Sequence, residues 1–177
     1  MWQHRKIQDM NVAAVDPGDE RKLEVVVAGL PLFHGAQVAV DASIVSPLRR
    51  NGKPRPRARW QNGAALLDSR KRKERRYPEL VGSRRCRLVV GAVEVGGRWS
   101  AEAVDFVERL AAAKAFTVPG ELRVATRKAY TKRWGTFLAM AAQGAFAETL
   151  VHGTAQRADL WTAPLPALGE VLGDNGR

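Results

Sequence analysis

The sequence is poor in the residues that build disulfides and zinc sites. Among 177 residues there is one cysteine, Cys86, and three histidines, which are scattered along the chain. A single cysteine excludes an internal disulfide and a zinc site made of several thiolates. The spacing of the histidines does not indicate a metal site either. This cysteine usage predicts an intracellular, reducing compartment.

Long hydrophobic runs are also missing. The first eight residues lack the apolar centre of a signal peptide. The longest apolar stretch, residues 134–151, is interrupted by Gln143 and Glu148 and is too short and too polar to span a bilayer. We therefore expect a soluble protein with no membrane partner.

Acidic residues are scarce relative to basic ones. There are 29 Lys and Arg residues against 18 Asp and Glu residues, so the formal net charge is +11. Such an excess favours polyanions, either nucleic acid or an anionic membrane surface. A soluble basic protein without a specific anionic partner is the alternative. The clustering of the charges favours nucleic acid, with DNA as the expected partner and RNA as the alternative.

The order of the predicted elements indicates an α/β fold with a small mixed β-sheet and flanking helices. Residues 22–45 have the pattern of a β-hairpin, and residues 87–95 predict a third strand, apolar enough to be central. A helix is expected at residues 62–77 with Asn62 as N-cap, and another at 100–116 with Ser100 as cap. The second of these helices has an apolar stripe at Val104, Val107, Leu110 and Ala111.

The C-terminal part predicts one long helix, which begins near Pro119 and ends near Val151. Its first half is basic and its second half is small and apolar. The expected organisation is an irregular lead-in (1–20), an α/β core (21–117), a basic, amphipathic helix packed on the core (118–152) and a flexible tail (153–177).

Two acidic residues lie in apolar strand sequences, Glu24 in the first strand of the hairpin and Asp41 in the second. An unpaired buried carboxylate costs several kcal/mol, so the pair suggests a shared cation or an ion pair. Mg²⁺ is suited to one or two carboxylates together with waters and a substrate phosphate. The alternative is structural, with Glu24 at a strand edge and Asp41 paired with an arginine.

The helix at 62–77 supplies candidate cations for this site. Lys73 follows Ser69 by four residues and therefore shares the side on which Ala65 and Leu66 lie. We expect Lys73, or failing that Lys71, to point toward the acids. A further acid, Glu94, lies in the third strand, where it is either a third metal ligand or a partner for Arg98.

A cationic loop at residues 49–59 provides a candidate surface for nucleic acid. It contains two prolines and no apolar periodicity, so we expect it to be mobile. It is followed by Trp60, which either stacks on exposed bases or packs on the core. The candidate nucleic-acid-binding residues are Arg49, Arg50, Lys53, Arg55, Arg57, Arg59, Lys71 and Arg72.

Four segments in order carry a resemblance to a known family: 23–27 with Glu24, 40–48 with Asp41, Arg72-Lys73 shortly before Tyr77, and 93–99 with Glu94. The series resembles the C-terminal restriction-like endonuclease region of non-LTR retrotransposon polyproteins. The resemblance covers about residues 21–150. No reverse transcriptase motif or zinc knuckle occurs in the sequence. The resemblance thus implies a detached fragment, a decayed element or a host gene derived from one.

The resemblance implies a PD-(D/E)xK nuclease core that hydrolyses phosphodiester bonds in DNA, in the nucleus if the source is eukaryotic. Glu24 and Asp41 match the positions that bind Mg²⁺ or Mn²⁺, although the first acid of the family is usually Asp. Ser43 stands where the lysine is normally found. Lys73 matches the lysine that the family often supplies from the following helix, and Glu94 matches a recurrent acid. These four, Glu24, Asp41, Lys73 and Glu94, are the candidate catalytic residues.

Two other functions remain open at this point. One is a nucleic-acid-binding module on the same fold without catalysis, which metal-dependent cleavage would distinguish from an enzyme. The other is a helical interaction domain built on residues 100–150, whose basic face docks an acidic partner.

Overall fold

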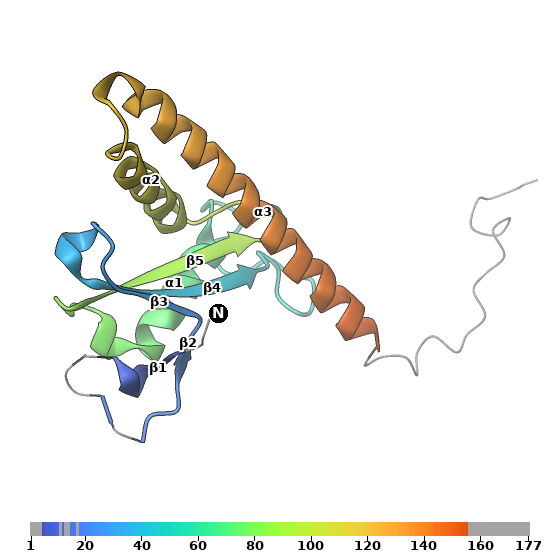
Figure 1. The fold of residues 1–177 in the computed structure, drawn as a ribbon. Helices are drawn as coiled ribbons and strands as arrows, with labels where there is room; N and C mark the ends of the chain where they lie inside the picture. The colour runs from blue at the N-terminus through green and yellow to red at the C-terminus, as the bar shows by residue number, and fades with distance from the viewer. Residues whose placement is uncertain (1–4, 11, 13–14, 17, 156–177) are drawn as a thin grey trace, which may run out of the picture. The chain divides into compact units, whose positions relative to one another are not determined.

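The computed structural model of the chain describes residues 5–10, 12, 15–16 and 18–155 (Figure 1). The strands are β1 (Arg5–Lys6), β2 (Lys22–Leu23), β3 (Val25–Val27), β4 (Gln37–Val45) and β5 (Cys86–Glu94), and the helices are α1 (Ala64–Arg76), α2 (Ala101–Ala115) and α3 (Arg123–Ala155). The chain forms two compact units, and the boundary between them lies between Ala142 and Gln143. Both sheets, α1 and α2 belong to the first unit. An α/β class with a small mixed sheet and a long C-terminal helix is confirmed.

The main sheet has the strand order β3-β4-β5. β3 runs antiparallel to β4, with Val25 opposite Val40, which confirms the expected hairpin. β4 runs parallel to β5, with Asp41 opposite Val90. The expectation that the third strand is central is wrong, because β4 is the middle strand and β5 lies at an edge of the described sheet. Seven of the nine residues of β5 are nevertheless buried, since helices cover both of its faces.

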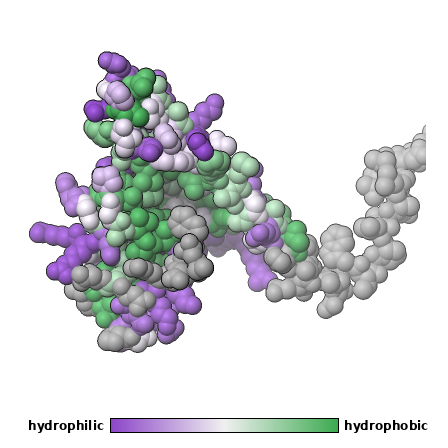
Figure 2. Space-filling view, viewed as in Figure 1, coloured by the Kyte–Doolittle hydropathy of each residue, from purple (hydrophilic) through white to green (hydrophobic). Residues whose placement is uncertain are grey.

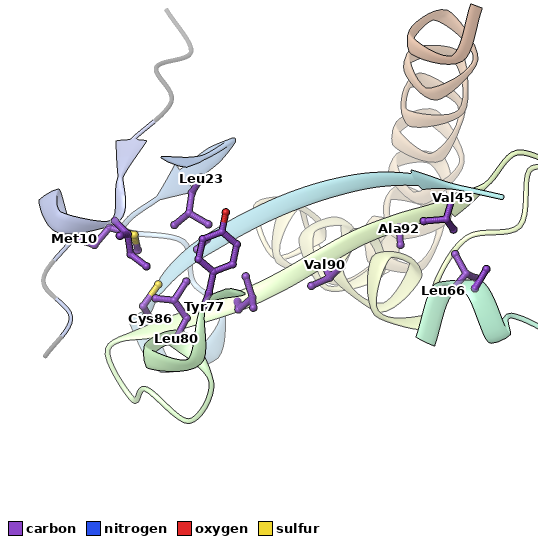
Figure 3. Packing of buried hydrophobic residues seen from close by; sticks show 13 residues of the cluster. Met10, Leu23, Val45, Leu66, Tyr77, Leu80, Cys86, Val90 and Ala92 are labelled. Carbon is purple, nitrogen blue, oxygen red and sulfur yellow. The ribbon is translucent and has the colours of Figure 1, made fainter. Parts of the chain in front are cut away.

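One face of the sheet packs against α1. Alternate residues of a strand share a face, and this face joins one buried cluster with α1: Leu23, Ala39, Val45, Leu66, Tyr77, Leu80, Cys86, Leu88, Val90 and Ala92. Figure 3 shows Leu66 beside Val45 and Ala92, whereas Tyr77 lies beside Leu23 and Cys86. Because Val45 and Ala92 are near the carboxyl ends of their strands and Cys86 begins β5, α1 runs antiparallel to β4 and β5.

The opposite face packs against α2 (Figure 1). Its N-cap is Ser100, as predicted, and the Ser100 hydroxyl accepts a hydrogen bond from the Ala103 N–H. The helix buries Ala103, Val107, Ala111 and Ala115 at steps of four. Val107 and Ala111 of the predicted stripe are therefore confirmed, whereas Val104 is 46% exposed. The small alanines of the buried stripe let the helix approach the sheet closely.

The lead-in contributes to the core, which the sequence did not predict. β1 pairs with β2, and Ile7 and Met10 are buried in the α1-side cluster. Isolated apolar residues among polar neighbours have no periodicity, so the pattern of residues 1–20 indicated irregular structure. Figure 2 shows hydrophobic side chains, in green, over the middle of the first compact unit and hydrophilic ones, in purple, around them.

The part of α3 up to Ala142 belongs to the same compact unit as the sheets. None of the α3 residues from Arg123 to Val151 is buried, but Thr131, Gly135 and Leu138 line a hollow together with Ala103, Val104 and Val107 of α2. Polar contacts add to this: the Arg127 Nη2 atom lies 3.6 Å from the Glu108 Oε2 atom, and the Lys114 ammonium lies 5.9 Å from the centre of the Tyr130 ring. Apolar residues occur on several sides of α3, so no single side provides a packing stripe. The predicted tail lies outside the described residues from 156 onward.

Candidate active site

An ion pair between β4 and α1 forms the centre of the candidate site. The Lys73 Nζ atom donates a hydrogen bond of 2.8 Å to the Asp41 Oδ1 atom. Asp41 is 3% exposed, and the Lys73 side chain is 17% exposed. A carboxylate at such a position is unfavourable unless it is paired. The ammonium therefore compensates the buried charge in the middle of the sheet.

The helical spacing positions Lys73 over Asp41. Leu66, Ser69, Lys73 and Tyr77 follow one another at intervals of three or four residues and face the sheet. Ser69 is fully buried, and its small side chain lets this part of α1 approach β4 closely. Lys71 is exposed, so the structure places Lys73 and not Lys71 at Asp41.

The second oxygen of Asp41 has no partner among the described residues. The Asp41 Oδ2 atom is buried and makes no hydrogen bond there. Buried polar atoms are nearly always hydrogen-bonded, so an orphaned carboxylate oxygen indicates a missing water, ion or ligand. Sequence analysis predicted a cation beside Asp41, but it did not predict that half of the carboxylate remains free.

Tyr77 is a site neighbour that sequence analysis did not single out. The hydroxyl of this fully buried tyrosine donates a hydrogen bond of 2.9 Å to the Lys22 carbonyl. Burial raises the pKa of Tyr77, and the nearby Asp41 charge raises it further. Its place one helical turn after Lys73 is the signal that could have identified it. Tyr77 therefore remains a neutral wall of the site at physiological pH.

Glu24 lies next to the ion pair in a bend between β2 and β3. The register of β3 and β4, extended by one residue, places it opposite Asp41. Its Oε2 atom accepts a hydrogen bond of 2.9 Å from the Ala42 N–H. The Glu24 side chain is exposed. Its bond to the Ala42 N–H takes the place of a backbone hydrogen bond between neighbouring strands. The structure thus holds Glu24 against the residue that follows Asp41.

Glu94 is not brought to the other acids. It shares the α1-side face with Asp41, because Asp41 pairs with Val90 and Val45 pairs with Glu94. Four residues separate these pairs along β4, or roughly 13 Å at the rise of a strand. The Glu94 Oε2 atom lies 3.8 Å from the Arg98 Nε atom. Of the two roles proposed for Glu94, the structure favours the partner of Arg98 over a shared metal ligand.

The cationic loop contains a tight turn that its composition did not predict. Leu48 and Pro54 form a β-bridge, and the Arg49 N–H donates to the Lys53 carbonyl. Gly52 permits this turn, because it adopts a φ of 74° that other residues rarely adopt.

The loop residues divide into exposed cations and cations held by the protein. Arg49, Arg50, Lys53 and Arg59 are exposed. The Arg55 Nε atom donates to the Ser46 carbonyl, and Arg57 pairs with Asp68 at 3.3 Å. Trp60 is 77% exposed, which excludes the core-packing alternative.

The cations of α1 also include both exposed side chains and one that is held by ion pairs. Lys71 and Arg72 are exposed, in keeping with a surface role. Arg70 is half-buried instead: it contacts Glu74 at 2.9 Å and reaches Glu102 of α2 around the edge of β5. Sequence analysis missed this link because it joins helices that cover opposite faces.

The described part of the site offers a metal ion two carboxylates at most. Within the described parts of the chain, no group of three or more His, Cys, Asp and Glu side chains could hold one. Two carboxylates remain, the free Asp41 Oδ2 atom and the Glu24 side chain beside Ala42. Mg²⁺ needs only one or two carboxylates because it keeps several waters. The donor set therefore agrees with Mg²⁺ or Mn²⁺ and with no thiolate-bound metal.

Comparison with known proteins found no matching family model, curated protein or solved structure. In the described part of the chain, no helix has the length and apolar character needed to cross a membrane.

Proposed function

We propose that the chain is a metal-dependent DNA endonuclease domain with a restriction-like core, centred on Asp41 and Lys73 and derived from a retrotransposon. The observation that carries this proposal is the buried Asp41 carboxylate, with one oxygen bonded to the Lys73 ammonium and the other free. This combination of a lysine and an available carboxylate oxygen is suited to phosphodiester hydrolysis. The family resemblance of the sequence and the net charge of +11 support a nucleic-acid substrate.

Each residue has a role that follows from its position. Asp41 and Glu24 would hold Mg²⁺ or Mn²⁺, whose contribution at such sites is to stabilise phosphate charge and lower the pKa of a bound water. Lys73 has three N–H donors and gives one to Asp41, so the others remain to orient a water or bind a phosphate oxygen. Tyr77 and Ser69 exclude water from one side of the pair.

The proposal is tested by incubating supercoiled DNA with the purified protein and Mg²⁺ or Mn²⁺, with EDTA as a control. We expect metal-dependent nicking. Lys73→Ala should lower the rate by about two or more orders of magnitude, because it removes an electrostatic contact made mostly in the transition state. DNA affinity should change little, since one phosphate contact among many is lost.

Arg75→Ala is the matched control, because it removes a positive charge from an exposed position two residues away on α1. Its cleavage rate should remain close to that of the parent. Equal losses in both variants would show that the two cations act only by attracting DNA. Nicking that persists in EDTA, or in Asp41→Asn, would contradict the proposed site.

A nucleic-acid-binding module without catalysis is the second candidate. It is favoured by the small number of possible metal ligands in the described residues. It predicts DNA binding in which Mg²⁺, Mn²⁺ and Asp41→Asn have no effect, and no cleavage under any of these conditions.

A further inference from the structure

A second site lies where β4 and β5 begin. The short 3-10 turn Phe33–Gly35, the loop before β5, the first part of β5 and α2 together line a cavity of about 850 Å³. This volume is within the range of small-molecule pockets. Its chemically distinctive lining residues are Phe33, Ser83, Arg84, Arg87 and Arg109. None of the residues that line it is acidic.

The cavity is separate from the Asp41 site. Arg87 precedes Leu88, which belongs to the cluster beneath α1, so the Arg87 side chain lies on the opposite, α2-facing side of β5. Arg109 comes from α2 itself. Asp41 and Lys73 lie on the α1 side. An inference about this cavity therefore does not depend on the proposed nuclease activity.

An aromatic ring holds two of the arginines at the cavity. The Arg87 and Arg109 Cζ atoms each lie 5.7 Å from the centre of the Phe33 ring. Cation–π contacts of this kind restrict where a guanidinium can lie while leaving its N–H groups available. The ring is itself held in an uncommon way, since Phe33 and the following His34 have φ angles of 50° and 58°. Two successive left-handed residues other than glycine persist only where the surroundings fix them.

The positive charge of the cavity is not fully balanced. Arg109 pairs with Asp105 at 2.7 Å, but Arg84 and Arg87 are exposed at the cavity wall and form no ion pair with an acidic side chain among the residues that the structure describes. Ser83 adds a polar group: its Oγ atom accepts hydrogen bonds from the Arg85 and Cys86 N–H groups, so its own proton is left to donate. The same cavity is therefore lined by guanidinium groups and a hydroxyl donor, the groups that bind anions in proteins.

We propose that this cavity binds a phosphate group, with Arg84 and Arg87 as its main contacts and Ser83 as an additional donor. Planar guanidinium groups match two oxygens of a phosphate at once, and a dianion balances two cations better than a single carboxylate does. The phosphate comes either from a small phosphorylated molecule or from a nucleic-acid backbone. Both sources present the same group to the same arginines.

The test uses the full chain and pyrophosphate as the probe, measured by titration calorimetry at constant ionic strength. Replacing Arg84 and Arg87 together by glutamine should weaken pyrophosphate binding by at least about tenfold, since two charge-assisted contacts are lost. The matched control replaces Arg75 and Arg133 by glutamine. Both are exposed, and Arg133 lies over the Phe137 ring at 5.5 Å much as Arg87 lies over Phe33. The control should bind pyrophosphate as the parent does.

A short single-stranded DNA oligonucleotide separates the two sources. If the cavity receives a backbone phosphate, the Arg84 and Arg87 variant loses oligonucleotide affinity beyond the loss in the control. If it receives a small molecule, only pyrophosphate binding is lost. Either result supports the proposal. Equal effects of the variant and the control on both ligands, or equally strong binding of the dicarboxylate succinate to the parent, would overturn it.

A measurement on the unmutated protein guards against a folding defect in the variant. Phenylglyoxal modifies accessible arginines, and mass spectrometry identifies the modified positions. Pyrophosphate should protect Arg84 and Arg87 from modification while Arg75 and Arg133 react at an unchanged rate. Equal protection of all four arginines, or of none, would contradict a phosphate site at this cavity.

Discussion

At the scale of single residues, the Asp41–Lys73 pair matters more for what happens when one partner is lost than for the stability that the intact pair adds. Each partner is needed because the other is buried, yet an ion pair in a core is rarely more stabilising than two apolar side chains of similar size. Removing one partner alone therefore leaves an uncompensated charge. The Asp41 Oδ2 atom makes no hydrogen bond among the described residues, which is uncommon for a buried carboxylate oxygen.

The buried pair predicts strong energetic coupling. Lys73→Met leaves Asp41 charged and unpaired, and we expect it to lower the free energy of unfolding by about 3 kcal/mol. Asp41→Asn should also destabilise. The double variant should lose less than the sum of the two single losses, with a coupling of about 1–3 kcal/mol. Urea denaturation of the four proteins measures it.

The exposed pair of Arg109 and Asp105 on α2 serves as the control for this cycle. Its atoms are 2.7 Å apart, but both side chains are more than half exposed. Solvent screens such a pair, so its coupling should be hardly measurable. Additive losses at Asp41 and Lys73 would mean that the two side chains do not interact in solution.

Cys86 makes stability depend on pH in the alkaline range. It is fully buried, and burial raises the pKa of its thiol from 9.0 to about 11. The unfolded chain therefore releases this proton at a lower pH than the folded protein does. The stabilisation is complete below about pH 9 and is lost as the pH rises toward about 11. The raised pKa of Tyr77 acts in the same direction at higher pH.

The measurement is the free energy of unfolding at several pH values for the parent and for Cys86→Ala. The variant is expected to be less stable at every pH because it creates a cavity, but its stability should fall less steeply above about pH 9. Lysine and arginine titrate in both proteins and cancel in the comparison. Parallel curves would show that the thiol does not titrate differently on folding.

At the scale of elements, the capping residue of α2 joins the helix to the sheet. The Ser100 Oγ atom accepts from the Ala103 N–H at 3.3 Å and donates to the Val90 carbonyl at 3.2 Å. The capping bond satisfies an N–H at the start of α2, and the second bond holds this start against the edge strand β5. One hydroxyl therefore fixes the turn that follows β5.

Ser100→Ala should lower the free energy of unfolding by about 1–2 kcal/mol, as the loss of an N-cap does in other helices. Ser100→Thr keeps the hydroxyl and should recover most of that loss. Thr117→Ala, which removes a hydroxyl from the other end of α2, is the comparison because the Thr117 hydroxyl donates to the Lys114 carbonyl within its own turn. A loss no larger at Ser100 than at Thr117 would contradict the linking role. Chemical denaturation reports all three variants.

Local sequence patterns predicted where the helices and strands lie in the chain, but they predicted less well which elements are neighbours in the fold. Alternation in β4 and the serine before α2 are local signals, and β5 and α2 each begin and end within one residue of their predicted bounds. The N-cap of α1 was wrong, because Gly63 with a φ of 73° precedes the helix where Asn62 was expected. The edge position of β5 could not be predicted, since burial by helices gives the same apolar run as burial by strands.

The same distinction holds for the candidate site. Helical spacing alone placed Lys73 on the face of α1 that meets the sheet, and its contact with Asp41 follows from that. The link from Arg70 to Glu102 and the cavity around Phe33 each join elements distant in the chain. No pattern within one segment contains that information, so only the tertiary structure shows them.

At the scale of the whole molecule, the net charge of +11 sets how the protein meets a polyanion. Phosphate contacts release counterions, so the logarithm of DNA affinity should fall linearly with the logarithm of the salt concentration, by about 0.9 per phosphate contacted. A slope near zero in the parent protein would exclude binding through phosphates.

A comparison of two surfaces tells whether this binding is localised. One variant replaces the exposed loop cations Arg49, Arg50, Lys53 and Arg59 by glutamine, and the other replaces four exposed cations of α3, Arg123, Lys128, Lys132 and Arg133. Each lowers the net charge by four, so any long-range attraction is reduced by a similar amount. Arg55 and Arg57 are kept, because they bond to Ser46 and Asp68 and support the loop. If the loop contacts DNA, only the first variant should flatten the salt slope, by as much as about 3.6 for four lost phosphate contacts. Equal flattening in both variants would mean that DNA is attracted by the charge of the whole surface, and a larger effect of the α3 variant would move the DNA contact from the loop to that helix.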